Sequence, residues 1–429
     1  MPSPASAVAA LRTAAGSAIS LWLAFAAVHL WLGFLNLYGP GLPMGDVTYV
    51  YLFWVERGLN DGEWVGLDTA WVYPVLALVP MLAAYAFGPD LYATTWLTII
   101  MALNAVALVS IIGVQERARR APVAWWWMLF LLLVGPIALG RIDAVTVPVA
   151  LVAVMLIADH PKWGGALLAV GAWIKVWPAA LVLAAFIALR ARAAVVMSVL
   201  VVSVGVVALA LPFGSLLALV SPITQQSARG LQVESIIATP WLWAAAAGQP
   251  GTRVYYDQGI LTWQVLGEGT ALAADLMTPL LALVVLIIAV LGLQALRRGA
   301  SELELFPVLS LALVMALIVM NKVGSPQFAT WIAVPIVLGL AWRRWGGQSF
   351  MTPAVLGLII AGLTQLVYPV LYSRLLTLDT GMLLVLTARN VLYLILLAWA
   401  VQQIAVLCWR PRVAVPLLEP AADEEGASA

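Results

Sequence analysis

Long apolar runs separated by short polar connectors dominate the pattern along this chain. A helix needs about 20 apolar residues to cross a hydrocarbon core of about 30 Å. We therefore predict an all-α polytopic membrane protein with about ten full spans, near residues 18–37, 91–113, 123–140, 144–158, 193–213, 272–296, 304–320, 326–342, 352–371 and 384–408.

Two further apolar stretches are interrupted and do not fit a simple span. Residues 74–87 are short and contain Pro80, and residues 164–190 are broken near Lys175 and Pro178. Proline removes a helical hydrogen bond and disfavours helix at the preceding residue. We predict a re-entrant or half-length helix for the first stretch, and for the second a helical hairpin that enters the membrane and returns.

Composition supports the membrane assignment. The chain is 64% hydrophobic and 10% charged, with a mean hydropathy of +1.03, whereas about a quarter of the residues of a soluble protein are charged. The net charge of +1 argues against nucleic acid as a partner. The single cysteine, Cys408, excludes an intrachain disulfide and zinc-cysteine chemistry.

Basic residues assign the sides of the membrane, because short cytoplasmic loops accumulate Lys and Arg. With both termini inside, the cytoplasmic face receives Arg12, Arg117, Arg119, Arg120, Lys162, Arg190, Arg192, Arg297, Arg298, Arg343, Arg344, Arg410 and Arg412. We expect one transmembrane domain over residues 1–410, a retained first span, and a disordered cytoplasmic acidic tail at 411–429. The outer face then holds the connector around Asp46, the segment 214–271 and the turn 321–327, with periplasmic interfacial helices among them.

The connector after the first span places a carboxylate at the point where the chain leaves the bilayer. Residues 46–60 fit an amphipathic helix in the interface plane, with Asp46, Tyr49, Phe53, Glu56 and Arg57 on one face and Val47, Tyr51, Leu52 and Val55 on the other. We predict Asp46 as a catalytic base. Asp46 also suits a helix N-cap, and the two roles are compatible.

Other polar residues in apolar or outward segments are candidates for binding. Lys175 at membrane depth is costly unless it is paired or solvated, and its alternative is snorkelling to the interface. Lys322 can bind a phosphate or act as an interfacial anchor. In the outward segment, Arg229 can pair with phosphate, and the hydroxyl groups of a sugar can be bound by Gln232, Glu234 and Ser235. That cluster is equally compatible with an ordinary polar loop.

Five short motifs, in this order, resemble glycosyltransferase family 87 of the GT-C class. They are Asp46-x-x-Tyr49, Tyr73-Pro74, Gly171-x-x-x-Lys175-x-x-Pro178, Glu234-Ser235 and Ser325-Pro326-Gln327-Phe328. The resemblance implies a GT-C-like fold and a polyprenyl-phosphate-sugar donor, and among family members are actinobacterial mannosyltransferases and an arabinofuranosyltransferase. Two departures, Val75 in place of a second proline and Phe328 in place of tyrosine, leave the sugar open among mannose, arabinofuranose and glucose.

The resemblance also assigns roles to residues. It implies a base at Asp46 and a donor phosphate bound by Lys175, Arg229 or Lys322, with further substrate-binding candidates Tyr49, Arg57, Tyr73, Ser325 and Gln327. The expected partners are the lipid-linked donor, a glycolipid or glycan acceptor and membrane lipid. No cofactor is expected, and the lack of a D-x-D arrangement argues against a required metal.

Two other classes of function remain open. A secondary transporter or lipid flippase also has broken helices and intramembrane charge, and would place Lys175 on a transport route. A non-catalytic membrane scaffold predicts that Asp46, Lys175 and Lys322 can be neutralised without loss of function.

Overall fold

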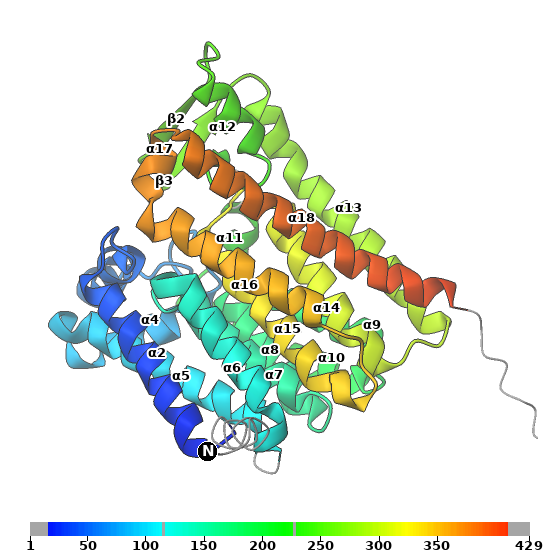
Figure 1. Ribbon diagram of the computed structural model, residues 1–429. Helices are drawn as coiled ribbons and strands as arrows, with labels where there is room; N and C mark the ends of the chain where they lie inside the picture. Colours follow the sequence, from blue (N-terminus) through cyan, green and yellow to red (C-terminus); the bar gives the residue numbers. More distant parts are fainter. Residues whose placement is uncertain (1–15, 114–115, 226–228, 411–429) are drawn as a thin grey trace, which may run out of the picture.

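The computed structural model describes residues 16–113, 116–225 and 229–410, so Arg12, Arg412 and the predicted acidic tail lie outside the described residues. The described chain is mostly helical (Figure 1). Within these ranges, eight helices, some continued by short 3₁₀ or π turns, are long and apolar enough to cross a membrane, which confirms a multi-pass helical protein. They are α2 (Ala18–Tyr38), α5 (Tyr92–Ile112), α6 (Arg117–Val134), α10 (Arg192–Ala210), α13 (Thr270–Arg297), α14 (Glu302–Val319), α16 (Met351–Gln365) and α18 (Thr380–Trp409).

Shorter helices complete the bundle and one of its ends. They are α3 (Leu52–Asp61), α4 (Leu78–Ala84), α7 (Asp143–Leu156), α8 (Pro161–Ile174), α9 (Ala179–Ala188), α11 (Leu216–Gln225), α12 (Thr239–Ala246), α15 (Ala333–Trp342) and α17 (Tyr372–Leu376). Two predicted full spans fall in this group, because residues 144–158 lie mainly in the 14-residue α7 and residues 326–342 form a 3₁₀ turn followed by the 10-residue α15. Both are largely buried, so their apolar character reflects the protein core, as is usual for apolar helices of this length.

The predicted half-length helix and the predicted break near Pro178 are confirmed, but Pro80 lies within α4 and does not interrupt it. Residues Val75–Phe87 form a short apolar helix. The second stretch is split into α8 and α9, with Lys175 in an extended conformation and Pro178 immediately before α9. The break therefore exposes polar groups inside an otherwise apolar hairpin.

Helix α14 lies at the centre of the bundle. Nearly all of its side chains from Leu305 to Val319 are buried, and it packs against α9, α13, α15 and α18. A helix that is apolar all round is stable only where it is surrounded on every side. By contrast, α10 and α13 expose large apolar side chains such as Val201, Leu209 and Leu286, as expected of helices that face lipid.

A small antiparallel sheet within residues 214–271 is an exception in a described chain that is otherwise helical, as the all-α prediction expected. Strands β1 (Leu231–Gln232), β3 (Thr262–Leu266) and β2 (Arg253–Asp257) pair in that order. Aromatic and β-branched residues favour strands, and the Tyr256 and Trp263 rings, on directly paired residues, lie 5.2 Å apart. The backbone N–H of Gly259 donates to Asp257 Oδ1 at 2.9 Å, which stabilises the hairpin turn.

The two ends of the bundle differ in character. At one end, ion pairs join loops that are distant in sequence: Arg190 with Glu302 at 3.3 Å, Glu116 with Arg344, and Glu304 with Arg410. The predicted cytoplasmic arginines in these loops therefore share one end. At the opposite end lie the sheet, α12 and α17, at the top of Figure 1.

Candidate functional site

A cavity of about 710 Å³ lies beside the β2–β3 hairpin, at the end of the bundle that carries the sheet. It is bordered by the Asp46 connector, the α8–α9 break, the β2–β3 hairpin and the turn before α15. Nine of the twelve candidate residues predicted from the sequence line it: Asp46, Tyr73, Lys175, Arg229, Gln232, Glu234, Lys322, Ser325 and Gln327. Segments separated by more than half of the chain thus converge on one space, as predicted for the three outward elements.

Tyr49, Arg57 and Ser235 do not line the cavity. Tyr49 is 66% exposed, Arg57 is exposed and paired with Glu63, and Ser235 is buried. The helix from Asp46 begins with a π turn, Asp46–Tyr51, before α3. A π turn has its hydrogen bonds from residue i to i+5. Asp46 and Tyr51, five residues apart, both line the cavity, whereas Tyr49 does not.

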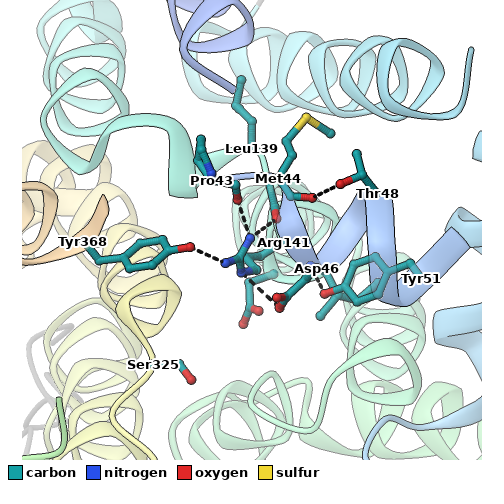
Figure 2. Close-up of polar contacts among 12 residues, drawn as sticks. Pro43, Met44, Asp46, Thr48, Tyr51, Leu139, Arg141, Ser325 and Tyr368 are labelled. Atoms are coloured by element: carbon teal, nitrogen blue, oxygen red, sulfur yellow. Dashed lines mark hydrogen bonds and ion pairs between the residues drawn. The ribbon is translucent and has the colours of Figure 1, made fainter. Parts of the chain in front are cut away.

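Arg141 holds the Asp46 carboxylate at the edge of the cavity (Figure 2). Arg141 Nε lies 3.1 Å from Asp46 Oδ2, and the exposed fractions of the two side chains are 8% and 40%. The Arg141 Nη1 group donates to the carbonyl oxygens of Pro43 and Gly140, and Nη2 donates to the Tyr368 hydroxyl at 3.0 Å. Four of the five guanidinium N–H groups are thereby used within the protein.

Backbone geometry around Arg141 explains this arrangement. A Cβ atom at Gly140 would lie 2.8 Å from the Pro43 carbonyl oxygen, so the close approach of the connector requires glycine. Burial acts to lower the pKa of Arg141, but the Asp46 carboxylate and the Tyr368 and Tyr51 phenols raise it above its ordinary value. The guanidinium is therefore charged and fixed.

Two tyrosines extend this polar edge. The Tyr51 hydroxyl accepts a hydrogen bond from the backbone N–H of Ile142 at 3.2 Å and lies 3.5 Å from the Tyr73 hydroxyl. Burial raises the pKa of Tyr51 well above its usual range, so this phenol stays protonated. It ties the π turn to the start of α7.

Lys175 is paired inside the helical break. Its Nζ lies 3.5 Å from Asp143 Oδ2 and 4.5 Å from the centre of the Tyr73 ring. Asp143 Oδ1 accepts a 2.6 Å hydrogen bond from the Trp331 indole. Snorkelling therefore does not describe Lys175, because its charge is directed into the site and is balanced there by a buried carboxylate.

Arg229 and Lys322 are two further cationic residues of the cavity lining. Burial lowers the pKa of both side chains, and the Arg229 charge lowers that of Lys322 further, while Asp257 and Asp275 act in the other direction. The buried Nε atom of Arg229 has no hydrogen-bond partner among the described residues. An anion placed between the two side chains would relieve their repulsion.

A further polar part of the lining surrounds Glu234. This side chain is 2% exposed, and burial raises its pKa, although hydrogen bonds from Tyr372 and Gln232 and the nearby Arg389 oppose the shift. The backbone here meets the turn before α15 very closely, because Gln232 N donates to the Lys322 carbonyl oxygen at 3.0 Å. Arg389, on α18, donates to the Glu234 carbonyl oxygen.

Sequence reasoning missed Arg141, Asp143, Tyr368, Tyr372 and Arg389. A usable signal was present for the first pair, since Arg141 and Asp143 place opposite charges between two apolar runs, where charge is costly unless paired. Tyr368-Pro369 repeats the Tyr73-Pro74 step that was noticed. Both steps present a phenol to the cavity.

No protein-family model, curated protein or solved structure matches this chain. The resemblance to glycosyltransferase family 87 therefore stays a prediction from the motifs, and the chemistry of the site is argued from its own geometry.

Proposed function

We propose that this chain is an integral membrane glycosyltransferase that moves a sugar, with mannose favoured, from a polyprenyl-phosphate donor to a hydroxyl of a lipid-linked or cell-envelope glycan. The observation that carries the proposal is the cavity itself. A half-exposed carboxylate, Asp46, is fixed by Arg141 in a space that also receives Lys175, Arg229 and Lys322. The GT-C-like family assignment, and arabinofuranose or glucose as alternative sugars, belong to the same proposal.

Asp46 is the base in the proposed reaction. Its Oδ2 is paired with Arg141, and Oδ1 accepts no hydrogen bond from any described residue. Oδ1 takes the proton of the acceptor hydroxyl while that oxygen bonds to the anomeric carbon. The bond from the anomeric carbon to the phosphate oxygen breaks, and polyprenyl phosphate leaves with the electron pair. A direct displacement of this kind inverts the anomeric configuration.

The cationic side chains divide into two roles. Arg141 donates its hydrogen bonds to protein groups, and the charge of Lys175 is balanced by Asp143. Arg229 and Lys322 border the cavity within range of each other's charge. We assign the donor phosphate to Arg229 and Lys322, because cations that line the cavity stabilise the charge that grows on the leaving group.

The proposed location is the cell membrane, with the cavity at the extracytoplasmic face and both termini in the cytoplasm. This orientation rests on the arginines of the opposite end, such as Arg297 and Arg343, and on the preference of basic loops for the cytoplasm. A lipid-linked donor then reaches the site from the bilayer.

The test uses purified protein in lipid, polyprenyl-phosphate mannose labelled in the sugar, and a lipoglycan extract as acceptor. Asp46→Asn keeps the size of the side chain and removes its ability to take a proton, so transfer should fall about 10²–10⁴-fold. Asp61→Asn, an exposed change at the end of α3, is the matched control and should retain full transfer.

Each other outcome has a definite meaning. Full activity of a folded Asp46→Asn variant would show that Asp46 is not the catalytic base. If the wild type transfers none of mannose, arabinofuranose or glucose, the broken α8–α9 hairpin and its Lys175–Asp143 pair favour transport instead.

A further inference from the structure

Tyr368 occupies a special backbone position at the cavity. It has φ −143° and ψ 129°, an extended conformation between the end of α16 and Pro369. A residue that precedes proline is driven out of the helical region. The phenol therefore leaves the face of α16 and reaches Arg141 (Figure 2).

The hydrogen of this phenol has a defined direction. A tyrosine hydroxyl carries one hydrogen to donate and lone pairs that accept. Arg141 Nη2 donates to the Tyr368 oxygen at 3.0 Å, so the hydroxyl acts as an acceptor toward Arg141. No described residue accepts the Tyr368 hydrogen, and the side chain lines the cavity. The O–H group is left to donate into the space where a ligand would lie.

Arg141 also increases the donor strength of this phenol. A hydroxyl that accepts from a cation is polarised and becomes a better donor, since hydrogen bonds in a chain strengthen one another. The same guanidinium contacts Asp46 through Nε and Tyr368 through Nη2. One buried cation thus presents an acceptor, the carboxylate, and a donor, the phenol, to one cavity.

We propose that Tyr368 is a substrate-binding residue of the transfer site, donating its O–H to a substrate oxygen bound beside Asp46. This inference rests on the proposed function. The oxygen belongs to a hydroxylated ligand, and the sugar of the donor and the alcohol of the acceptor share that chemistry. Tyr51 and Tyr372 do not serve in this way, because their hydroxyls are engaged with Tyr73 and Glu234.

The test is Tyr368→Phe, which removes only the hydroxyl. It keeps the aromatic ring, whose centre lies 5.6 Å from Arg141 Cζ. We expect kcat/KM to fall about 10-fold, the net worth of one hydrogen bond. A rise in KM for the donor alone or for the acceptor alone identifies which substrate supplies the oxygen. Tyr38→Phe, an exposed phenol at the end of α2 and outside the cavity, is the matched control and should be unchanged.

A purely positioning role would look different. If Tyr368 acted only through Arg141 and Asp46, kcat would fall and the KM values for donor and acceptor would stay unchanged. The apparent pKa of the essential base in the pH–rate profile would shift. That pattern, or unchanged kinetics, would overturn the inference while wild-type transfer kept the proposed function intact.

Binding provides a second readout that does not need turnover. The dissociation constants of the labelled donor and of the lipoglycan acceptor are measured for protein in nanodiscs. Tyr368→Phe should raise the dissociation constant of one substrate about 10-fold relative to wild type. If the variant binds both substrates as tightly as wild type, the inference is overturned. A wild type that neither binds nor transfers these substrates would overturn the proposed function, and this inference with it.

Discussion

Arg141 Nε lies 3.1 Å from Asp46 Oδ2, although the two residues come from connectors after different membrane-length helices. The guanidinium acts as a fork that also binds two carbonyl oxygens and a phenol. Lysine keeps the charge and cannot reproduce the fork. Arg141→Lys should therefore lower sugar transfer about 10²-fold by misplacing the carboxylate. Arg298→Lys, an exposed change at the end of α13, should leave transfer unchanged. Full transfer by Arg141→Lys would show that the fork is dispensable.

Breaking the Lys175–Asp143 pair should destabilise the protein strongly. Asp143→Asn keeps an oxygen for the Trp331 indole and removes the charge that balances Lys175. Leaving one buried ion without its partner typically costs about 3–5 kcal/mol. Thermal unfolding in nanodiscs should show a large loss for Asp143→Asn, and much of it should be recovered by adding Lys175→Met. The exposed Lys162→Met is the control, and no recovery in the double variant would mean that the charges are not coupled.

Gly324 allows the turn before α15 to touch the strand that precedes Glu234. A Cβ atom at Gly324 would lie 2.2 Å from the backbone nitrogen of Ser235, whereas a Cβ at Gly205 on α10 meets nothing within 4 Å. Gly324→Ala should therefore lower the unfolding midpoint and sugar transfer together. Gly205→Ala should be neutral or stabilising by up to about 1 kcal/mol. Equal behaviour of the two variants would contradict the close approach.

Stability should depend on pH through Glu234. Burial raises the pKa of its carboxyl in the folded protein, whereas an unfolded glutamate titrates near about 4.3. The folded state binds the proton more tightly, so this contribution is fully present below the unfolded pKa and is lost as pH rises through the folded pKa. The unfolding midpoint of the wild type, minus that of Glu234→Gln, should decline as the pH rises from the unfolded to the folded pKa of Glu234. A flat difference would be inconsistent with a buried carboxylic acid at this position.

The orientation of the bundle can be measured by thiol labelling. In a Cys408→Ala background, Gln258→Cys marks the β2–β3 turn and Arg298→Cys marks the end of α13, and both native side chains are exposed. A membrane-impermeant maleimide should label position 258 in intact cells and position 298 only after permeabilisation. The reverse pattern would place the cavity at the cytoplasmic face, which would contradict the proposal that the donor is used at the extracytoplasmic face.

The sequence by itself determined the membrane class, the positions of most long helices and the break near Pro178. These properties are local, because hydropathy over about 20 residues and the missing N–H of proline act within one segment. The polar residues of the three outward elements could also be predicted to meet, since charge distribution restricts which loops share a side.

Only the tertiary structure decided how the site is built. The partners of Asp46 and Lys175, namely Arg141 and Asp143, are fixed by the docking of helices distant in sequence. A 100° helical wheel could not show that Asp46 turns toward the cavity, because a π turn changes the angle per residue. The lengths of α7 and α15 escaped prediction for a related reason: burial in protein and burial in lipid select the same apolar residues, and only packing distinguishes them.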